Sequence, residues 1–318
     1  MKIPLTRSWI PVLLFVGLLL PGVVARGASD PSDTDPTVFG DGIFNKFGLD
    51  LGFAGRTHRW SIYTYGAGTS SSPFTALDVS GSSNKLVSDV DSDVALAGTN
   101  SRLNVSNFGD VEGDRFEQTT STETTSGNGF IGGSRISNAS TNNLLNGGVT
   151  SLKNVSNSAF GLAVTSGSPT NISLSGSSMT ITNNPFGGKY VMKLSNFVLA
   201  KHSTLTLNGV AGSAFIINVS QNFSLKDASR IVLTGGLTPS DVLFNVRGGS
   251  GNLSIASGSL FQGTLLAYNS SSSTQRTLTV MGKDTMTNGE LLANKVIVSK
   301  GATVKKPKKK SRDNDDDD

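Results

Sequence analysis

The sequence predicts an all-β chain that folds as a β-solenoid, and two observations lead to this prediction. From about residue 160 onward, short apolar runs alternate with turns rich in Gly, Ser and Asn, a pattern typical of short strands joined by tight connections. Similar segments recur there after 26 or 27 residues, which suits one coil of a solenoid. No 11-residue stretch carries the apolar stripe of an amphipathic helix.

Two pairs of segments carry the repeat. Ile-Ile-Asn-Val at 216–219 recurs as Leu-Phe-Asn-Val at 243–246, and Gly-Thr-Leu-Leu-Ala at 263–267 recurs as Gly-Glu-Leu-Leu-Ala at 289–293. A single coil cannot bury its own apolar side chains, so successive coils stack and share one core. The alternative is that these are coincidental matches within a β-sandwich.

The repeat makes a specific prediction about two asparagines. Asn218 and Asn245 hold equivalent positions in the two copies. In a stack of coils they would lie next to each other, and we expect their amides to form a ladder inside the coil.

The N-terminus has the three parts of an export signal. Lys2 and Arg7 precede an uncharged apolar run at 12–20, and small residues lead to a cleavage position after Ala25. The run is shorter than the roughly 20 apolar residues that a membrane span needs. We therefore expect residues 1–25 to be a signal peptide, and the mature protein to be secreted and without a membrane span.

The remaining chain divides into three regions. A polar lead-in covers 26–58, the solenoid domain covers 59–304, and a charged tail covers 305–318. The tail places six basic residues before five acidic ones, and we expect it to be disordered. Within the domain, the Thr- and Ser-rich stretch 117–129 has almost no apolar residues and predicts an exposed loop.

Composition excludes several classes of function. The chain has no Cys and two His, which excludes disulfides, thiolate zinc sites and thiol nucleophiles. The net charge of +4 comes mainly from the chain ends, so no basic face is available for nucleic acid. The Gly-x-Gly-x-x-Gly match at 127–132 follows a Thr/Ser run and precedes further loop residues, whereas a dinucleotide site needs a strand before it and a helix after it.

Two kinds of site remain as candidates. Asp89, Asp91 and Asp93 alternate and resemble the start of an EF-hand loop, but Val94 and Asn100 stand where that loop needs Gly and Glu. A calcium site of another type stays open, and otherwise we expect no metal or cofactor. Asn-x-Ser/Thr sequons, which are sites of N-glycosylation in hosts that modify them, occur at Asn104, Asn138, Asn154, Asn171, Asn218, Asn222, Asn252 and Asn269.

Four blocks of the domain resemble the choice-of-anchor A family of exported, surface-displayed proteins. The blocks are Ser-Asp-Val-Asp-Ser-Asp-Val-Ala-Leu-Ala-Gly at 88–98, Val-Leu-Phe-Asn-Val at 242–246, and the paired segments 261–267 and 288–293. The resemblance implies a right-handed β-solenoid similar to the bacterial ice-binding-like fold, with an adhesive role.

These observations lead to a first functional hypothesis with two alternatives. The first hypothesis is a secreted or surface-associated, non-enzymatic protein of adhesive or extracellular-matrix type, which binds a polysaccharide, a matrix protein or another extracellular surface. One alternative is a polysaccharide-processing enzyme, which would need paired carboxylates. The other is an ice- or crystal-binding protein, which would need a flat, regular Thr-rich face; the pairs Thr204–Thr206 and Thr277–Thr279 supply only two steps of one.

Overall fold

The computed structural model describes residues 60–82, 85–247, 253–268 and 275–305. They all belong to the second of the chain's two compact units, Pro36–Asp318. The expected signal peptide, the whole polar lead-in and the tail beyond Lys305 lie outside the described residues.

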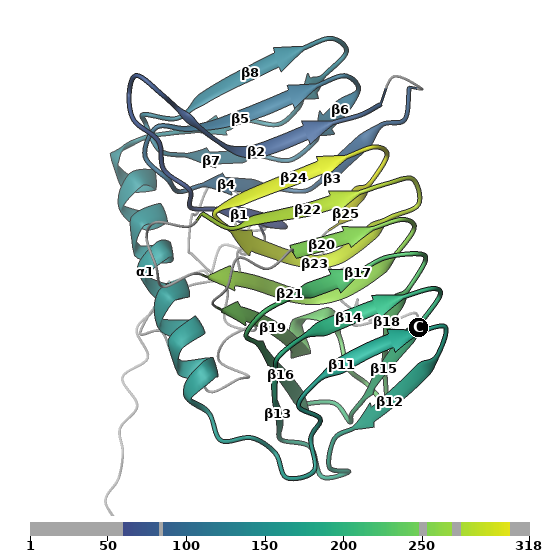
Figure 1. Cartoon of the computed structure of the whole chain (residues 1–318). Coiled ribbons are helices and arrows are strands. Elements are labelled where there is room, and N and C mark those ends of the chain that lie inside the picture. The colour runs from purple at the N-terminus through teal and green to yellow at the C-terminus, as the bar shows by residue number, and fades with distance from the viewer. Residues whose placement is uncertain (1–59, 83–84, 248–252, 269–274, 306–318) are drawn as a thin grey trace, which may run out of the picture. The chain divides into compact units, whose positions relative to one another are not determined.

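The described residues form a solenoid in which each complete coil contributes one strand to each of three faces (Figure 1). All strand pairings given for the two sheets are parallel. One face is a nine-stranded sheet, and the other two are parts of a sixteen-stranded sheet. In order of pairing, the nine-stranded sheet contains β11 (Ile172–Ser175), β14 (Phe197–Ala200), β17 (Phe223–Leu225), β20 (Leu253–Ala256), β22 (Thr277–Met281), β24 (Lys295–Ser299), β2 (Phe74–Ser80), β5 (Ser101–Ser106) and β8 (Thr122–Ser126).

The sixteen-stranded sheet bends round a corner of the solenoid. We call its two parts the open face and the helix face, and two long strands, β21 (Leu260–Tyr268) and β23 (Met286–Ala293), belong to both. The open face also contains β12 (Ser178–Thr182), β15 (Thr204–Asn208), β18 (Arg230–Thr234), β25 (Thr303–Lys305), β3 (Ser88–Asp91), β6 (Gly109–Val111) and β9 (Phe130–Ile131). The helix face also contains β13 (Lys189–Leu194), β16 (Ala214–Val219), β19 (Val242–Arg247), β1 (Ile62–Thr64), β4 (Val94–Leu96), β7 (Arg115–Glu117) and β10 (Arg135–Ile136).

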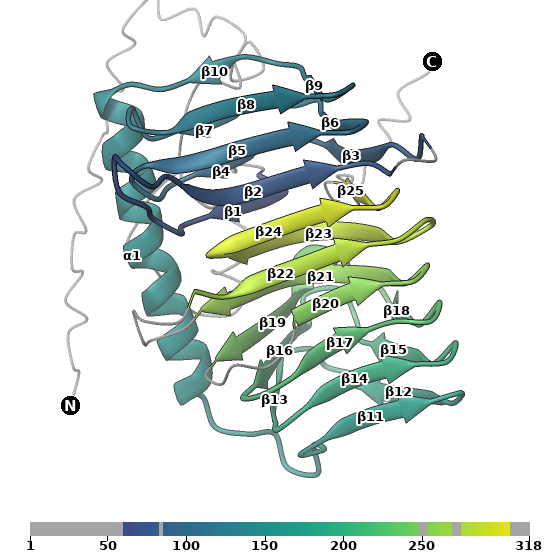
Figure 2. The ribbon, with the colours of Figure 1, turned by 45° about the horizontal axis from the view of Figure 1, so that its top comes forward.

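The coils are not stacked in chain order. Strand β24 pairs with β2 and strand β23 pairs with β1, so the last described coil lies against the first one. Helix α1 (Ala139–Gly161) runs along the helix face and contacts β7, β16, β19 and β21 (Figures 1 and 2). It carries the chain from the β7 end of the stack to the β13 end, from which the later coils return. A short 3-10 helix, η1 (Pro239–Asp241), precedes β19.

Two apolar clusters hold this arrangement together. Inside the coils, alternate residues of most strands are apolar and buried, and phenylalanine rings contact one another from coil to coil. The rings of Phe197 and Phe223 are 5.1 Å apart, and those of Phe244 and Phe261 are 5.4 Å apart. The second cluster lies between the helix face and α1, where Leu145, Leu152 and Val155 of the helix are buried.

The register of the strands confirms the predicted solenoid. Asn218 is paired with Asn245, and Gly263 is paired with Gly289, as the repeat requires. The sandwich alternative is wrong because each repeat forms one coil of parallel strands instead of two facing sheets.

Three expectations need correction. The stretch 117–129 is not a loop throughout, because Thr122–Ser126 form β8, an edge strand in which Glu123 pairs with Arg115 and the other four residues are exposed. Threonine also favours strands. Helix α1 was not expected, because small or polar residues such as Thr141, Gly148 and Ser151 occupy buried positions of its stripe and hide the apolar pattern. Its first residue follows Asn138, whose side chain accepts a hydrogen bond from the Thr141 amide.

The third correction concerns the asparagine ladder, which lies outside the coils. The Asn245 amide donates to Oδ1 of Asn218 at 2.7 Å, as expected of a ladder. It also donates to the Ser156 carbonyl, and Asn218 donates to the Ala159 carbonyl. Both asparagines therefore attach α1 to the helix face, because the amides point away from the apolar interior towards the helix backbone.

Gly289 lies on β23, one of the two strands shared by the open face and the helix face. We expect a substitution there to reduce stability strongly. A β-carbon there would lie 1.8 Å from the Gly263 carbonyl oxygen, so the two coils would have to separate. We expect Gly289→Ala to lower the free energy of unfolding by about 3 kcal/mol, at the upper end of overpacking costs, measured by urea denaturation. Gly161→Ala is the control, since nothing lies within 4 Å of its β-carbon; equal stability of the two variants would contradict this account.

Candidate functional surface

The outer face of the nine-stranded sheet carries the most regular array of side chains in the described structure. Apart from the polar edge strand β8, the strands alternate buried apolar residues with outward residues, and the outward side chains of neighbouring strands fall into two columns. The first column runs through the pairs Ser173–Val198, Val198–Ser224, Ser224–Ser254 and onwards. In strand order it contains Ser173, Val198, Ser224, Ser254, Thr279, Ile297, Asp78, Asn104 and Thr124.

The second column is made of serine and alanine side chains, apart from Met281. It contains Ser175, Ala200, Ala256, Met281, Ser299, Ser80, Ser106 and Ser126, with β17 ending before this position. Neighbours within a column are separated by the strand spacing of about 4.8 Å, and the two columns by roughly 6.7 Å, two residues along a strand. Figure 2 shows the nine strands side by side over the length of the stack.

Hydrogen bonds between neighbouring strands restrict several of these side chains. The hydroxyls of Ser224 and Ser254 are 3.1 Å apart. At the other end of the sheet, Asn104 donates to Asp78 at 2.8 Å, and Thr124 donates to Oδ1 of Asn104 at 3.0 Å. Side chains that already hold each other in place lose little conformational entropy when a rigid surface contacts them.

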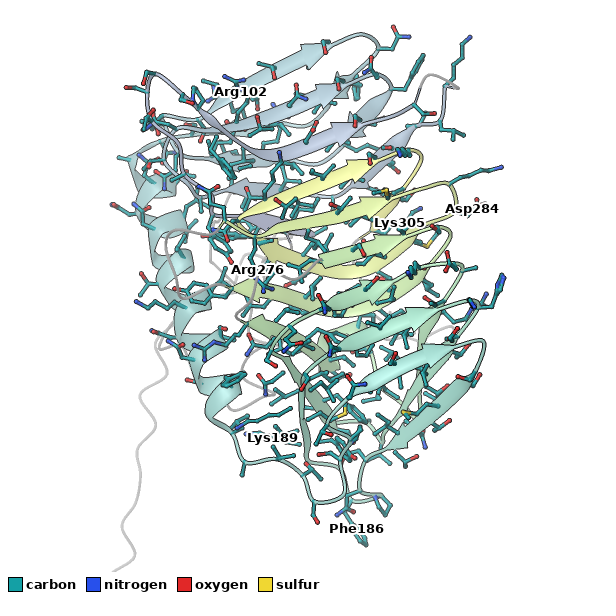
Figure 3. All side chains as sticks on the ribbon, viewed as in Figure 1. Arg102, Phe186, Lys189, Arg276, Asp284 and Lys305 are labelled. Atoms are coloured by element: carbon teal, nitrogen blue, oxygen red, sulfur yellow. The ribbon has the colours of Figure 1, made fainter. Side chains whose placement is uncertain are left out.

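Few charged residues lie on this surface. Asp78 is the only acidic or basic residue within the two columns, and the exposed Lys226 follows β17 at the point where the second column is interrupted. Arg102 projects from β5 near the Asp78 end of the sheet (Figure 3), and Lys295 begins β24. The columns over β11, β14, β20 and β22 contain no charged residue.

The three aspartates that were candidates for a calcium site have different surroundings. Asp89 and Asp91 point outward from β3, whereas Asp93 follows the strand and accepts a hydrogen bond from the Asp114 amide at 2.8 Å. In the part of the chain that the structure describes, no group of three His, Asp or Glu residues is placed to hold a metal ion. Asp110 lies directly opposite Asp89 on β6, so like charges meet there.

Three acidic side chains have raised pKa values, and burial is the main cause of the raised pKa of Asp110. Burial, together with the charges of Glu112, Asp91 and Asp110, raises the pKa of Asp89 to about 6. Burial and the neighbouring Glu123 raise the pKa of Glu117 to about 7, although Arg135 lies 2.9 Å away and opposes the shift.

These shifts predict that the protein loses stability as the pH rises from 5 to 8. Between its ordinary pKa of 3.8 and about 6, Asp89 holds a proton in the folded chain that the unfolded chain releases; for Glu117 the window is 4.5 to about 7. We expect a melting temperature about 5 °C lower at pH 8 than at pH 5, measured by calorimetry. Asp89→Asn should raise the pH 8 value and weaken the dependence. A melting temperature that rises over this range would contradict the assignment.

The sequons differ in accessibility. Asn138, Asn154 and Asn171 are exposed, and Asn104 and Asn222 are half-buried. Asn218 is fully buried, and its amide is engaged under α1, so a glycan there is incompatible with this fold. Asn252 and Asn269 lie outside the described residues.

The structure places the two threonine pairs on different faces of the solenoid. Thr204 and Thr206 lie on the open face, whereas Thr277 and Thr279 lie on the nine-stranded sheet. Asp284 projects from the turn between β22 and β23 (Figure 3), and Asp241 is held in η1, where it accepts from Thr238. Among the described residues, no helix combines the length and apolar character needed to cross a bilayer.

The columns themselves were missed because we searched for threonine pairs along single strands. The surface is built across strands, and each strand adds only two small side chains of mixed type. The signal that would have found it is the recurrence of small side chains at matching strand positions after 18 to 30 residues.

Comparison with proteins of known structure gives distant matches. An ice-binding protein from an Arctic yeast (LeIBP) is 16% identical, with 86% of this chain and 96% of that chain covered and a TM-score of 0.49. An ice-binding protein from an Antarctic biological consortium is 14% identical, with 86% and 94% covered and a TM-score of 0.49. The DUF3494 domain of an ice-binding protein from Shewanella frigidimarina is 15% identical, with 79% and 95% covered and a TM-score of 0.44.

Comparison at the level of sequence gives one curated relative and one family model. A tRNA nuclease CdiA from Burkholderia pseudomallei is 35% identical over 102 residues, which cover 32% of this chain and 8% of that protein. The chain therefore spans less than a tenth of that relative. The family model described as ice-binding-like matches residues 77–304, which include strands of all three faces and helix α1. The chain belongs to the ice-binding-like family.

Proposed function

We propose that this protein binds ice crystals through the outer face of its nine-stranded sheet. The observation that carries the proposal is the pair of registered columns of small side chains on that face. Family membership supports ice as the partner, since the family is described as ice-binding-like.

The physical argument rests on the rigidity of a crystal. A crystal plane cannot adapt its shape to a protein, so the protein must offer atoms at regular intervals that all reach the plane together. The parallel sheet provides this because each coil repeats the position of the one before it. Individual dispersion contacts and hydrogen bonds are weak, and only a large number of simultaneous contacts makes them effective.

The low charge of the columns fits the same partner. An ionised group holds its hydration water strongly, and removing that water is costly. Ser, Thr, Ala, Val and Ile side chains offer methyl groups and hydroxyls that can border ordered water without imposing a charge. The charged residues Arg102 and Lys295 lie outside the two columns.

This proposal replaces the adhesive function as our main conclusion. The choice-of-anchor A resemblance implied an adhesive role, whereas the family match favours ice binding, one of the alternatives from the sequence. We further propose that the protein is non-enzymatic and is exported, with residues 1–25 as its signal peptide and ice outside the cell as its partner.

Thermal hysteresis measures this function directly. Purified protein lacking residues 1–25 is expected to hold a seed crystal of ice without growth below the melting point and to give it facets. It should also slow recrystallisation in frozen sucrose solution. Heat-unfolded protein at the same concentration is the control. Round, freely growing crystals in the presence of the folded protein would refute the proposal.

A further inference from the structure

A second ordered array of small polar side chains lies on the open face, over β12, β15 and β18. The three strands have five residues each and pair in unbroken register, Thr180 with Thr206 and Thr206 with Val232. We call the nine outward side chains of these strands the hydroxyl grid. Its members are Ser178, Thr180 and Thr182 on β12, Thr204, Thr206 and Asn208 on β15, and Arg230, Val232 and Thr234 on β18.

Apolar packing beneath the sheet and a hydrogen bond within the grid hold its strands in place. Leu205, Leu207 and Ile231 alternate with the outward residues and are buried in the coil interior. Thr234 donates to Oδ1 of Asn208 at 3.0 Å. The strands of the grid therefore have little freedom, while side chains such as Thr180 and Thr182 remain exposed.

The grid adjoins the proposed ice-binding surface along one edge. Short turns with positive φ angles join β11, β14 and β17 of the nine-stranded sheet to their continuations in the grid, at Gly176, Lys201–His202 and Asp227–Ala228. Since these turns are short, both arrays extend to the edge, and they face in different directions because a corner of the coil separates them.

We propose that the hydroxyl grid is a second ice-binding surface, which engages a crystal plane different from the one bound by the nine-stranded sheet. The inference rests on the proposed function and deepens it. Two faces at an angle allow one molecule to recognise two orientations of the crystal surface.

The composition of the grid matches an uncharged, periodic partner. Arg230 is its only charged residue and stands at one corner, so a charged polymer finds almost no ionic contact. The grid contains no aromatic ring. It repeats the spacing of the nine-stranded sheet, about 4.8 Å between strands and roughly 6.7 Å along them.

The grid ends where the open face changes character. Beyond β18 the matching outward positions carry Leu260, Met286 and Thr303, and then the acidic residues Asp89 and Asp110. The second surface is thus three strands wide against nine, and we expect it to contribute less to ice binding.

Ice-plane affinity of a fluorescent protein tests the inference. Wild-type protein lacking residues 1–25 and its Thr206→Tyr variant are bound to a hemispherical single crystal, and the illuminated planes are compared. Thr206 lies at the centre of the grid, and tyrosine suits a strand while its ring lifts a flat plane away from the neighbouring side chains. We expect the wild type to illuminate two sets of planes and the variant to lose one of them. Thr150→Tyr, on the exposed side of α1, is the matched control and should illuminate both sets.

The outcomes separate this inference from the proposed function. If the wild type illuminates no plane, the proposed function itself fails. If the wild type binds and Thr206→Tyr illuminates the same planes with the same thermal hysteresis, the second surface does not exist. Loss of self-association or of glycan binding in that variant, with unchanged planes, would assign the grid to that partner and overturn the inference. Thr180→Tyr on the edge strand β12 replaces Thr206→Tyr if melting curves show that the latter is unfolded.

Discussion

Replacing Asn245 by aspartate is expected to lower the free energy of unfolding by about 3–5 kcal/mol, the cost of an uncompensated buried charge or unsatisfied buried group. The Asn245 amide donates to Oδ1 of Asn218 at 2.7 Å and to the Ser156 carbonyl at 3.0 Å. A carboxylate has nearly the same shape but donates nothing when ionised, so it would face two acceptors in a fully buried site. Urea denaturation at pH 7 measures the change.

Asn154→Asp provides the matched control, because Asn154 is exposed on the same helix. We expect its effect to stay within about 0.5 kcal/mol, as for most surface substitutions. Lower pH should restore part of the stability of Asn245→Asp, since a protonated carboxyl can again donate one hydrogen bond. Equal losses in the two variants would show that the ladder does not fasten α1.

The ladder matters for function because α1 makes the long sheet possible. The chain completes the coils that contain β2, β5 and β8, and α1 then takes it to the other end of the stack. The later coils return until β24 pairs with β2. Without a firmly attached helix, the nine strands would not form one continuous surface.

The repeat made the coil predictable from the sequence. Stacked coils place equal positions next to each other, so local matches such as Asn218 with Asn245 report directly on contacts in space. The same matches gave the correct register for Gly263 and Gly289.

The order of the coils was not predictable in this way. The contact between Leu77 and Val296 joins strands more than 200 residues apart, and neither strand belongs to a recognised repeat pair. Helix α1 was hidden because the close approach to the helix face favours small residues such as Gly148 and Ser156. Packing against a neighbour, which a single segment does not reveal, selects those residues.

Replacing Thr279 by tyrosine is expected to abolish most of the thermal hysteresis. Thr279 lies in the middle of the first column, between Ser254 on β20 and Ile297 on β24. A tyrosine ring there would project beyond its neighbours, and a rigid crystal plane resting on the ring would lose contact with the side chains around it. Because contacts to ice are individually weak, losing many of them at once should release the protein.

The stability of the protein should change little, since Thr279 faces outward and tyrosine favours strands. Thr150→Tyr on α1 makes the same exchange away from both arrays and should keep the hysteresis of the wild type. Full activity of Thr279→Tyr, combined with its loss in Thr206→Tyr, would mean that the hydroxyl grid is the principal ice-binding surface. The size of the nine-stranded sheet argues against that result, because its columns extend over three times as many strands as the grid.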